Sequence, residues 1–275
     1  MSHSQSLPPL RRIAICGGTH GNEMSGVYLV KHWLQDPSEL QRSTFQVTPF
    51  VGNPRAVEQC VRYTGRDLNR TFAAAFLNAK ASDSDLHEIQ RAQEINQIFG
   101  PKGSSQAYDF MLDLHNTTAN MGSCLLLKSE FSLLSIHVCN YIQKHCTVRH
   151  CPILICQQSG EEANFMMSVA KHGLGTLFPA FEIEAYTPVE RKDFPRYPNG
   201  EISAVIHPNL QDKDFQPLKP GDPVFQTFDG EDILHDGDDT FFPVFINEAA
   251  YYEKKTAFWK TKKETFAQPA LQKAF

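Results

Sequence analysis

The chain has no long hydrophobic run. No apolar stretch in its 275 residues approaches the ~18 residues that a membrane-spanning helix needs. Residues 1–9 have neither an apolar core nor a small-residue cleavage site, so we do not expect a signal peptide. These absences exclude an integral membrane helix and predict a cytoplasmic protein.

The chain also lacks a large excess of charge of either sign. It has 26 Lys and Arg against 31 Asp and Glu, with a formal net charge of -5. This balance gives no sign of a nucleic-acid-binding protein, which would carry a basic patch or stripe. The lysine-rich residues 254–263 are flanked by Glu253 and Glu264, and we interpret this stretch as a solvated face.

The seven cysteines form no regular framework. Their number is odd and no C-x-x-C is present, which is typical of reduced thiols in a cytosolic protein. One stretch invites a second-zinc interpretation because it is rich in Cys and His, but its spacings match no common structural zinc motif and residues 153–155 within it resemble a buried strand. We therefore expect no metal at this cluster: Cys139, His145, Cys146, His150, Cys151 and Cys156.

Apolar runs and amphipathic stretches alternate along the first two-thirds of the chain. This order is typical of an α/β fold with a mostly parallel sheet covered on both faces. The predicted strands are 12–16, 45–51, 108–114, 124–127 and 152–156, and the predicted helices are 23–34, 84–99 and 131–144.

The composition and the hydrophobic pattern of the chain change after about Thr176. Pro and Gly become frequent, and short apolar stretches replace the helical periodicity. This pattern is typical of a small β-rich unit. We therefore predict two domains, with residues 1–177 forming the α/β domain and residues 178–275 a β-rich C-terminal domain.

A His-x-x-Glu pair follows the first predicted strand. His20 and Glu23 stand in Gly-Gly-Thr-His-Gly-Asn-Glu, and His115 ends the strand 108–114. His and Glu are ordinary Zn²⁺ ligands, and ligands in open α/β sheets bind beyond the carboxyl ends of the strands. Asp113 is placed to orient a metal-bound His115. The alternative is that the pair decorates a solvated face, and the sequence alone leaves both readings open.

Three arginines stand close together between these candidate ligands, in residues 62–70. Arg62 could stabilise a negative charge that develops on an acyl oxygen. Arg70 with Asn69 could clamp a carboxylate through bidentate hydrogen bonds. The alternative is a set of surface arginines paired with local acids, and we expect Asp67 to brace one of the arginines.

Together these motifs resemble the aspartoacylase family of zinc carboxypeptidase-like amidohydrolases. The resemblance covers nearly the whole chain and implies a zinc-carboxypeptidase-like α/β/α mixed-sheet domain followed by a small β-rich domain that caps the site. The motifs are Gly17–Glu23, Asn53-Pro54, Asp67–Arg70, Asp113–Thr118 and Asn247–Lys255.

The resemblance also implies a set of site residues. His20, Glu23 and His115 would bind one Zn²⁺ per subunit. Arg62 would face the scissile carbonyl, Asn69 and Arg70 would bind the substrate's α-carboxylate, and Tyr251 would contact the substrate. We further expect a homo-oligomer that acts on a small N-acyl amino acid, and any association with the apical plasma membrane would be peripheral.

One substitution bears on the substrate. Where aspartoacylases carry an arginine for the side-chain carboxylate of acetylaspartate, just before a Ser-x-Ala-Lys stretch, this chain has Met167. An apolar pocket cannot compensate a desolvated carboxylate. The resemblance thus implies a deacylase of N-acyl aromatic L-amino acids, including N-acetyl cysteine S-conjugates (mercapturates), with an aspartoacylase-type enzyme as an alternative.

A family segment is missing near 175/176. It is a strand, a turn and a helix that carry the general-base glutamate, and here Gly175 runs straight into Thr176. A positioned acid–base group typically contributes ~10²–10⁴-fold to a rate. Glu182 and Glu184 are the nearest acids, but either would need a rearrangement to replace it. A catalytically inactive zinc- and ligand-binding variant is therefore a second hypothesis.

Overall fold

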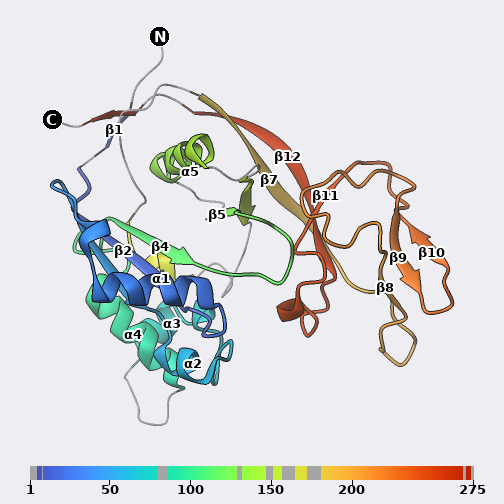
Figure 1. The fold of residues 1–275 in the computed structure, drawn as a ribbon, viewed down its shortest axis with the longest axis horizontal. Helices are drawn as coiled ribbons and strands as arrows, with labels where there is room; N and C mark the ends of the chain where they lie inside the picture. Colours follow the sequence, from blue (N-terminus) through green and yellow to red (C-terminus); the bar gives the residue numbers. More distant parts are fainter. Residues whose placement is uncertain are drawn as a thin grey trace.

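The computed structural model describes residues 5–7, 9–79, 86–128, 132–146, 151–156, 165–171, 181–268 and 271–273. An N-terminal α/β part and a β-rich C-terminal part lie at opposite ends of the long axis (Figure 1). Long curved strands run between the two parts. Within the described residues, no helix is long and apolar enough to cross a membrane.

The first sheet consists of three parallel strands in the order β3-β2-β4. They are β2 (Arg12–Gly17), β3 (Gln46–Val51) and β4 (Phe110–Leu114). Gly17, the last residue of β2, pairs with both Val51 and Leu114. The carboxyl ends of the three strands are therefore level, and the segments that follow β2 and β4 begin side by side.

Helices pack around this sheet, and the core between them includes Phe50 and Met111 of the sheet and Phe99 of the helix α4 (His87–Phe99). The chain passes very close to itself where β2 ends. A Cβ atom on Gly17 would lie 2.1 Å from the carbonyl oxygen of Gly26, so only glycine fits there. The helices are α1 (Met24–Gln35), α2 (Pro54–Gln59), α3 (Ala74–Leu77) and α4 (His87–Phe99), with 3₁₀ turns η1 (Ser38–Leu40), η2 (Leu68–Arg70) and η4 (Met166–Val169).

A second sheet joins strands from both halves of the sequence, in the order β11-β12-β7-β6-β5. The strands β5, β6 and β7 pair parallel to one another, whereas β12 pairs antiparallel with both β7 and β11. The helix α5 (Leu133–His145) lies between β5 and β6 in the chain. The strands are β5 (Leu125–Lys128), β6 (Ile153–Cys156), β7 (Phe181–Lys192), β11 (Phe242–Val244) and β12 (Phe258–Gln268).

The expected α/β fold with a β-rich C-terminal unit is thus present, but its strands are arranged differently from a single mostly parallel sheet. Among the described residues no strand joins β4 to β5, so the parallel strands fall into two sheets. The predicted domain boundary at 177/178 and the predicted join at 175/176 lie in residues 172–180, outside the described residues. Both stay predictions.

The remaining strands are short. β8 (Ala204–Ile206), β9 (Pro223–Thr227) and β10 (Asp232–Leu234) form an antiparallel sheet in the C-terminal part. Its core includes Phe194, Phe225 and Phe258. β1 (Gln5–Leu7) pairs with β13 (Leu271–Lys273), and η5 (Ala249–Tyr251) is a single 3₁₀ turn between β11 and β12.

The composition of the lysine-rich stretch indicated a solvated face, and the structure shows this for only part of it. Its second half forms β12, which lies between β11 and β7. Lys260 is only 8% exposed, and its Nζ lies 2.9 Å from Glu190 Oε2. A buried ammonium group needs such a partner because burial removes its hydration.

Candidate functional site

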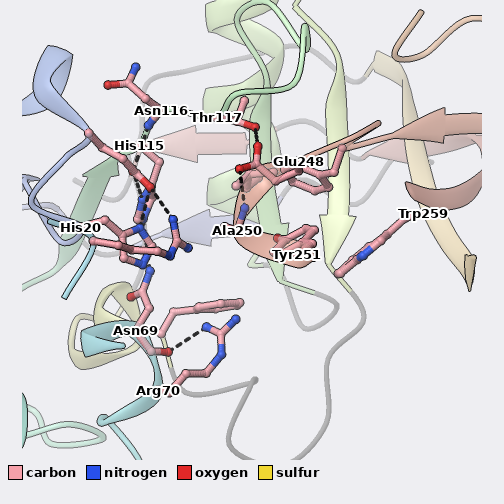
Figure 2. Close-up of a pocket in the computed structure, with 15 residues that line it drawn as sticks. His20, Asn69, Arg70, His115, Asn116, Thr117, Glu248, Ala250, Tyr251 and Trp259 are labelled. Atoms are coloured by element: carbon pink, nitrogen blue, oxygen red, sulfur yellow. Dashed lines mark hydrogen bonds and ion pairs between the residues drawn. The ribbon is translucent and has the colours of Figure 1, made fainter. Parts of the chain in front are cut away.

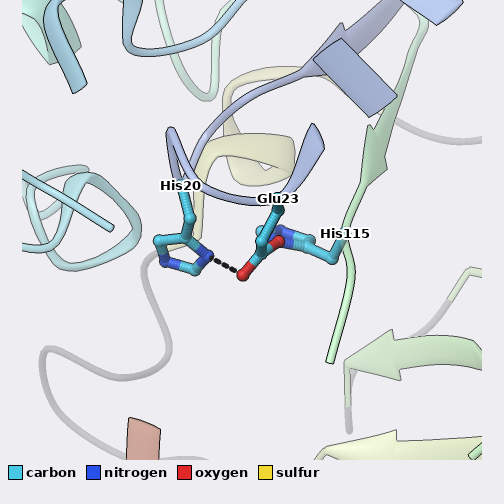
Figure 3. Close-up of side chains that lie close together, drawn as sticks. All are labelled: His20, Glu23 and His115. Atoms are coloured by element: carbon cyan, nitrogen blue, oxygen red, sulfur yellow. Dashed lines mark hydrogen bonds and ion pairs between the residues drawn. The ribbon is translucent and has the colours of Figure 1, made fainter. Parts of the chain in front are cut away.

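His20, Glu23 and His115 converge where β2 and β4 end. One candidate ligand atom from each lies within 4.8 Å of those of the other two, and Figure 3 shows the three side chains facing one another. Nδ1 of His20 lies 2.7 Å from Glu23 Oε1, and Nδ1 of His115 lies 2.7 Å from Glu23 Oε2. The structure thus brings together the three residues that the sequence selected as metal ligands.

The backbone accounts for this convergence. After β2 the chain turns through Gly18, whose φ is +75°, a conformation that glycine adopts without strain. Gly21 packs directly against α2, and a Cβ atom there would lie 2.0 Å from the carbonyl carbon of Ala56. The turn closes with the amide of Glu23 donating to the carbonyl oxygen of His20 at 3.2 Å, and α1 begins at the next residue.

Each histidine is held by a second carboxylate on its other ring nitrogen. Asp113 Oδ2 lies 2.8 Å from His115 Nε2, as predicted, and the hydroxyl of Thr19 donates to Asp113 Oδ1 at 2.6 Å. Asp67 Oδ1 lies 3.0 Å from His20 Nε2, whereas its contact with Arg62 is 4.0 Å long. We expected Asp67 to brace one of the arginines, but its carboxylate lies closer to the ring of His20 than to the guanidinium of Arg62.

The charges in this cluster stabilise one another. Burial alone would raise the pKa of Glu23, but hydrogen bonds from His115 and His20 outweigh it and hold this pKa far below its usual value. Burial opposes protonation of His115, yet the carboxylates of Asp113 and Glu23 prevail and raise its pKa to about 10. Without a metal, the cluster is an ionised carboxylate between imidazole rings.

This donor set fits a divalent metal. Two imidazoles and one carboxylate are the protein ligands of a common class of catalytic zinc site. In such sites the second nitrogen of each imidazole commonly bonds to a carboxylate, which fixes the ring and its tautomer. Asp67 and Asp113 occupy these outer positions for His20 and His115.

The arginine-rich loop is built around one buried side chain that the sequence did not indicate. Glu88 of α4 is fully buried. Its carboxylate accepts hydrogen bonds from the backbone amides of residues 64–66, from the hydroxyl of Thr64 and from the side-chain amide of Asn53. These donors outweigh the effect of burial and lower the pKa of Glu88 to about 2. The ionised carboxylate thereby fixes the loop beside the metal ligands.

The loop brings Arg62, Asn69 and Arg70 to the metal cluster. The guanidinium of Arg62 donates to Glu23 Oε1 at 3.0 Å. Nδ2 of Asn69 lies 3.2 Å from His115 Nε2. Arg70 donates to the carbonyl oxygen of Asn69 at 3.0 Å, and its guanidinium carbon lies 5.5 Å from the ring centroid of Phe165.

All seven predicted site residues line one pocket, which is open to solvent (Figure 2). The predicted members are His20, Glu23, Arg62, Asn69, Arg70, His115 and Tyr251, and the structure adds Asn116, Thr117, Leu126, Phe165, Phe245, Glu248, Ala250 and Trp259.

Among the described lining residues that sequence reasoning missed, Glu248 is the one with a charged side chain. It stands in the motif Asn247–Lys255, but nothing local showed what its side chain would contact. Its Oε2 accepts hydrogen bonds from the hydroxyl of Thr117 and from the amides of Thr118 at 2.9 Å and Ala119 at 3.3 Å, and its Oε1 accepts one from Ala250. The carboxylate thus fastens the segment after His115 to the C-terminal part.

Of the two candidates for a replacement base, only Glu184 has a described side chain, and it is not among the described pocket-lining residues. Glu184 of β7 points to solvent, where its Oε2 lies 2.7 Å from Lys263 Nζ. The side chain of Glu182 lies outside the described residues. Met167 packs against the first hydrophobic core rather than into the pocket.

Two family models match the chain. Residues 9–197 match the succinylglutamate desuccinylase/aspartoacylase catalytic domain, and residues 181–263 match the AstE/AspA barrel-sandwich hybrid domain. The chain is 49% identical to the human N-acyl-aromatic-L-amino acid amidohydrolase (carboxylate-forming), over 97% of this chain and 96% of the human protein. It is 43% identical to the aspartoacylase of Danio rerio, over 98% and 97% of the two chains.

The structure is similar to the crystal structure of murine aminoacylase 3, with a TM-score of 0.91, 43% identity, and coverage of 97% of this chain and 99% of that one. The alignment with the human relative spans 306 positions, more than the 275 residues of this chain. At least 31 of those positions therefore have no counterpart here. By its two matching domains and its close relatives, the chain belongs to the succinylglutamate desuccinylase/aspartoacylase family.

Proposed function

We propose that the protein is a zinc-dependent amidohydrolase that deacylates N-acyl aromatic L-amino acids, mercapturates included, to a carboxylate and a free amino acid. The observation that carries the proposal is one pocket in which a His₂Glu cluster stands beside two arginines and an aromatic wall. The similarity to the human and murine proteins supports the same activity.

His20, Glu23 and His115 would hold one Zn²⁺ per subunit. When bound, zinc supplies a Lewis acid that polarises the acyl carbonyl and activates water. Arg62, which donates to Glu23 Oε1, places a fixed positive charge where the acyl oxygen becomes negative. Arg70 and Asn69 bind the α-carboxylate and thereby orient the amide.

The pocket composition favours an aromatic over an acidic side chain. Among the described lining residues, the cationic side chains besides the histidines are Arg62 and Arg70. Arg62 would face the acyl oxygen and Arg70 would bind the α-carboxylate, so neither is left for a second carboxylate. Phe165, Phe245, Tyr251 and Trp259 provide ring surface instead. A second carboxylate, as in acetylaspartate, would lose its hydration there without a partner.

An inactive zinc- and ligand-binding variant is the second candidate, and one observation favours it. Glu23 and Glu248 are the carboxylates among the described lining residues, and both are saturated with hydrogen bonds. Neither is placed as a general base. In addition, at least 31 positions of the alignment with the human relative have no residue in this chain.

Zinc content and hydrolysis of N-acetyl-L-phenylalanine by this 275-residue chain test the two candidates, beside a version with the missing segment restored. Hydrolysis by both proteins supports an active enzyme in which another group replaces the base. Zinc in both but hydrolysis only in the restored protein supports the inactive variant. Absence of zinc from both contradicts both candidates.

A homo-oligomer in the cytoplasm, with at most peripheral attachment at the apical plasma membrane, completes the proposal. Size-exclusion chromatography with light scattering measures the mass of the assembly. Extraction of membranes with high salt removes peripheral proteins because salt screens their charges, so material that resists this extraction contradicts peripheral attachment.

A further inference from the structure

Thr19 contacts both arms of the candidate metal site. Its backbone directly precedes His20, and its hydroxyl donates to Asp113 Oδ1 at 2.6 Å. The other oxygen of the same carboxylate, Asp113 Oδ2, lies 2.8 Å from His115 Nε2. The side chain of Thr19 therefore reaches His115 through one carboxylate, although it touches no candidate ligand itself.

The fold buries this link completely. Cys16 of β2 and Asp113 of β4 are partners in the register of the parallel sheet, so the turn that follows β2 returns Thr19 to the end of β4. Thr19 is 0% exposed, and the side chain of Asp113 is fully buried as well. Water cannot replace a hydrogen bond that is lost at such a place, so the Asp113 oxygen would be left without a donor.

The hydroxyl of Thr19 is itself held on both sides. A hydroxyl has one proton to give and lone pairs to accept with. Its proton goes to Asp113, and Cys16 Sγ lies 3.5 Å from the hydroxyl oxygen. Burial raises the pKa of Cys16 well above its usual value, so the thiol keeps a proton that it can donate to Thr19. The hydrogen bonds thus run in one direction, from Cys16 through Thr19 to Asp113.

The direction matters because two neighbours of His115 Nε2 make opposite demands on it. Asp113 Oδ2 accepts a proton from this nitrogen at 2.8 Å. Nδ2 of Asn69, at 3.2 Å, can only donate, because the Oδ1 of Asn69 already accepts from the amide of Met166 at 3.0 Å. A neutral imidazole carries its proton on one nitrogen, so one of the two neighbours decides which.

A proton on Nε2 suits metal binding. It leaves the lone pair of His115 Nδ1 free, and Nδ1 is the nitrogen that faces Glu23, 2.7 Å from its Oε2. A carboxylate on the outer nitrogen of a metal-bound imidazole fixes both the ring and its tautomer. The bond from Thr19 to Oδ1 holds the carboxylate of Asp113 with Oδ2 toward His115.

Building on the proposed function, we propose that Thr19 is a positioning residue of the metal site. Its hydroxyl orients the carboxylate of Asp113, which keeps the proton of His115 on Nε2 and presents Nδ1 to zinc. The other histidine does not depend on this bond, because the carboxylate beside His20 is that of Asp67.

Zinc affinity of the 275-residue chain, measured by competition with a chromophoric chelator, tests this role. Thr19→Val keeps the shape of the side chain and removes the hydroxyl, whereas Thr19→Ser keeps the hydroxyl. Thr261→Val is the matched control. Thr261 of β12 is also 0% exposed, and its hydroxyl donates to the carbonyl oxygen of Phe242 at 2.5 Å, outside the described pocket lining.

We expect Thr19→Val to bind zinc about tenfold more weakly than the wild type, as loss of an outer partner of a metal ligand predicts. Thr19→Ser and Thr261→Val should keep the wild-type affinity. A Thr19→Val protein that binds zinc as tightly as the wild type overturns the role. So does a Thr19→Ser protein as weak as Thr19→Val, because the methyl group and not the hydroxyl would then be what matters.

Cobalt separates positioning from a loss of folded protein. The visible absorption of Co²⁺ depends on the arrangement of its ligands, so a misplaced His115 changes the spectrum of the bound ion. Partial unfolding only lowers the amount of bound ion. We expect the spectrum to change in Thr19→Val and to stay unchanged in Thr261→Val. A wild-type spectrum in Thr19→Val overturns the role.

A double-mutant cycle tests the path through Asp113. If Thr19 acts through this carboxylate, Thr19→Val should weaken zinc binding little further in a protein that already carries Asp113→Asn. A full loss in that background would show that Thr19 acts through its neighbour His20, which overturns the proposed path.

The same titrations separate this role from the proposed function. Zinc bound equally by the wild type and Thr19→Val removes the role of Thr19 and leaves the zinc enzyme standing. Absence of zinc from the wild type overturns the metal site of the proposed function, and the role of Thr19 with it.

Discussion

The carboxylate of Glu248 accepts a hydrogen bond from the hydroxyl of Thr117, across 131 positions of the chain. Thr117 follows the candidate ligand His115, and Glu248 precedes the turn η5 that carries Tyr251. Glu248 is 6% exposed, and two further backbone amides donate to the same oxygen. One buried carboxylate thus joins the metal-binding segment to the aromatic wall.

We expect Glu248→Gln to lower the free energy of unfolding by about 1.5–3 kcal/mol, because the amide group places donors against donors in a buried, charge-assisted cluster. Thr117→Val, which removes one donor, is expected to cost about 1 kcal/mol. Urea denaturation measures both, with Glu231→Gln on the exposed surface as control. A Glu248→Gln protein as stable as the Glu231→Gln control would exclude this role.

Substitution of His115 tests the metal centre. We expect His115→Ala to abolish stoichiometric zinc, because two protein ligands hold the ion far less firmly than three. Metal analysis after dialysis measures the zinc content. His32→Ala, which removes an exposed histidine of α1, should leave it unchanged. Full zinc content in His115→Ala would remove this residue from the set of ligands.

Substitution of Arg70 tests the carboxylate clamp. We expect the wild type to bind N-acetyl-L-phenylalanine more tightly than its carboxamide by about 10- to 100-fold, as a charge-assisted hydrogen bond predicts. In Arg70→Ala this preference should disappear. Arg66→Ala, a charge change in the same loop but outside the pocket lining, should retain it. A preference for the acid that survives in Arg70→Ala would assign the clamp to another group.

Asp214 predicts a pH dependence of stability. It is 7% exposed, its Oδ1 accepts from the amide of Ile246 at 3.2 Å, and its Oδ2 has no partner among the described residues. Burial raises its pKa to about 6. A carboxyl group with a raised pKa stabilises the folded state when protonated, and this contribution is lost as pH rises through the folded pKa.

We therefore expect Asp214→Asn, which stays neutral, to gain stability relative to the wild type as pH rises from about 4 to about 6, by up to about 3 kcal/mol. Urea denaturation across this range measures the difference. Asp229→Asn, at an exposed turn, should follow the wild type. A difference between Asp214→Asn and wild type that does not change with pH would show that the pKa of Asp214 is the same in the folded and unfolded states.

Much of the fold could be predicted because its signals are local. The strand expected at 12–16 is Arg12–Gly17, and the helix expected at 131–144 is Leu133–His145. The strand β12 was missed because it has neither a long apolar run nor an alternating pattern: residues 258–261 are buried and residues 262–265 are exposed, and lysines occur in both blocks. Lys260 is buried there with Glu190, on the neighbouring strand, and the ring of Phe241 as partners for its ammonium group.

The sequence by itself determined the family motifs and the strand ends at which His20 and His115 stand, since the order of short apolar runs defines where parallel strands stop. The tertiary structure alone decided that Glu88 fixes the arginine loop, that Glu248 reaches Thr117, and that Trp259 faces the pocket. These contacts join segments far apart in the chain, and no local periodicity records which distant side chain will supply a buried group with its partner.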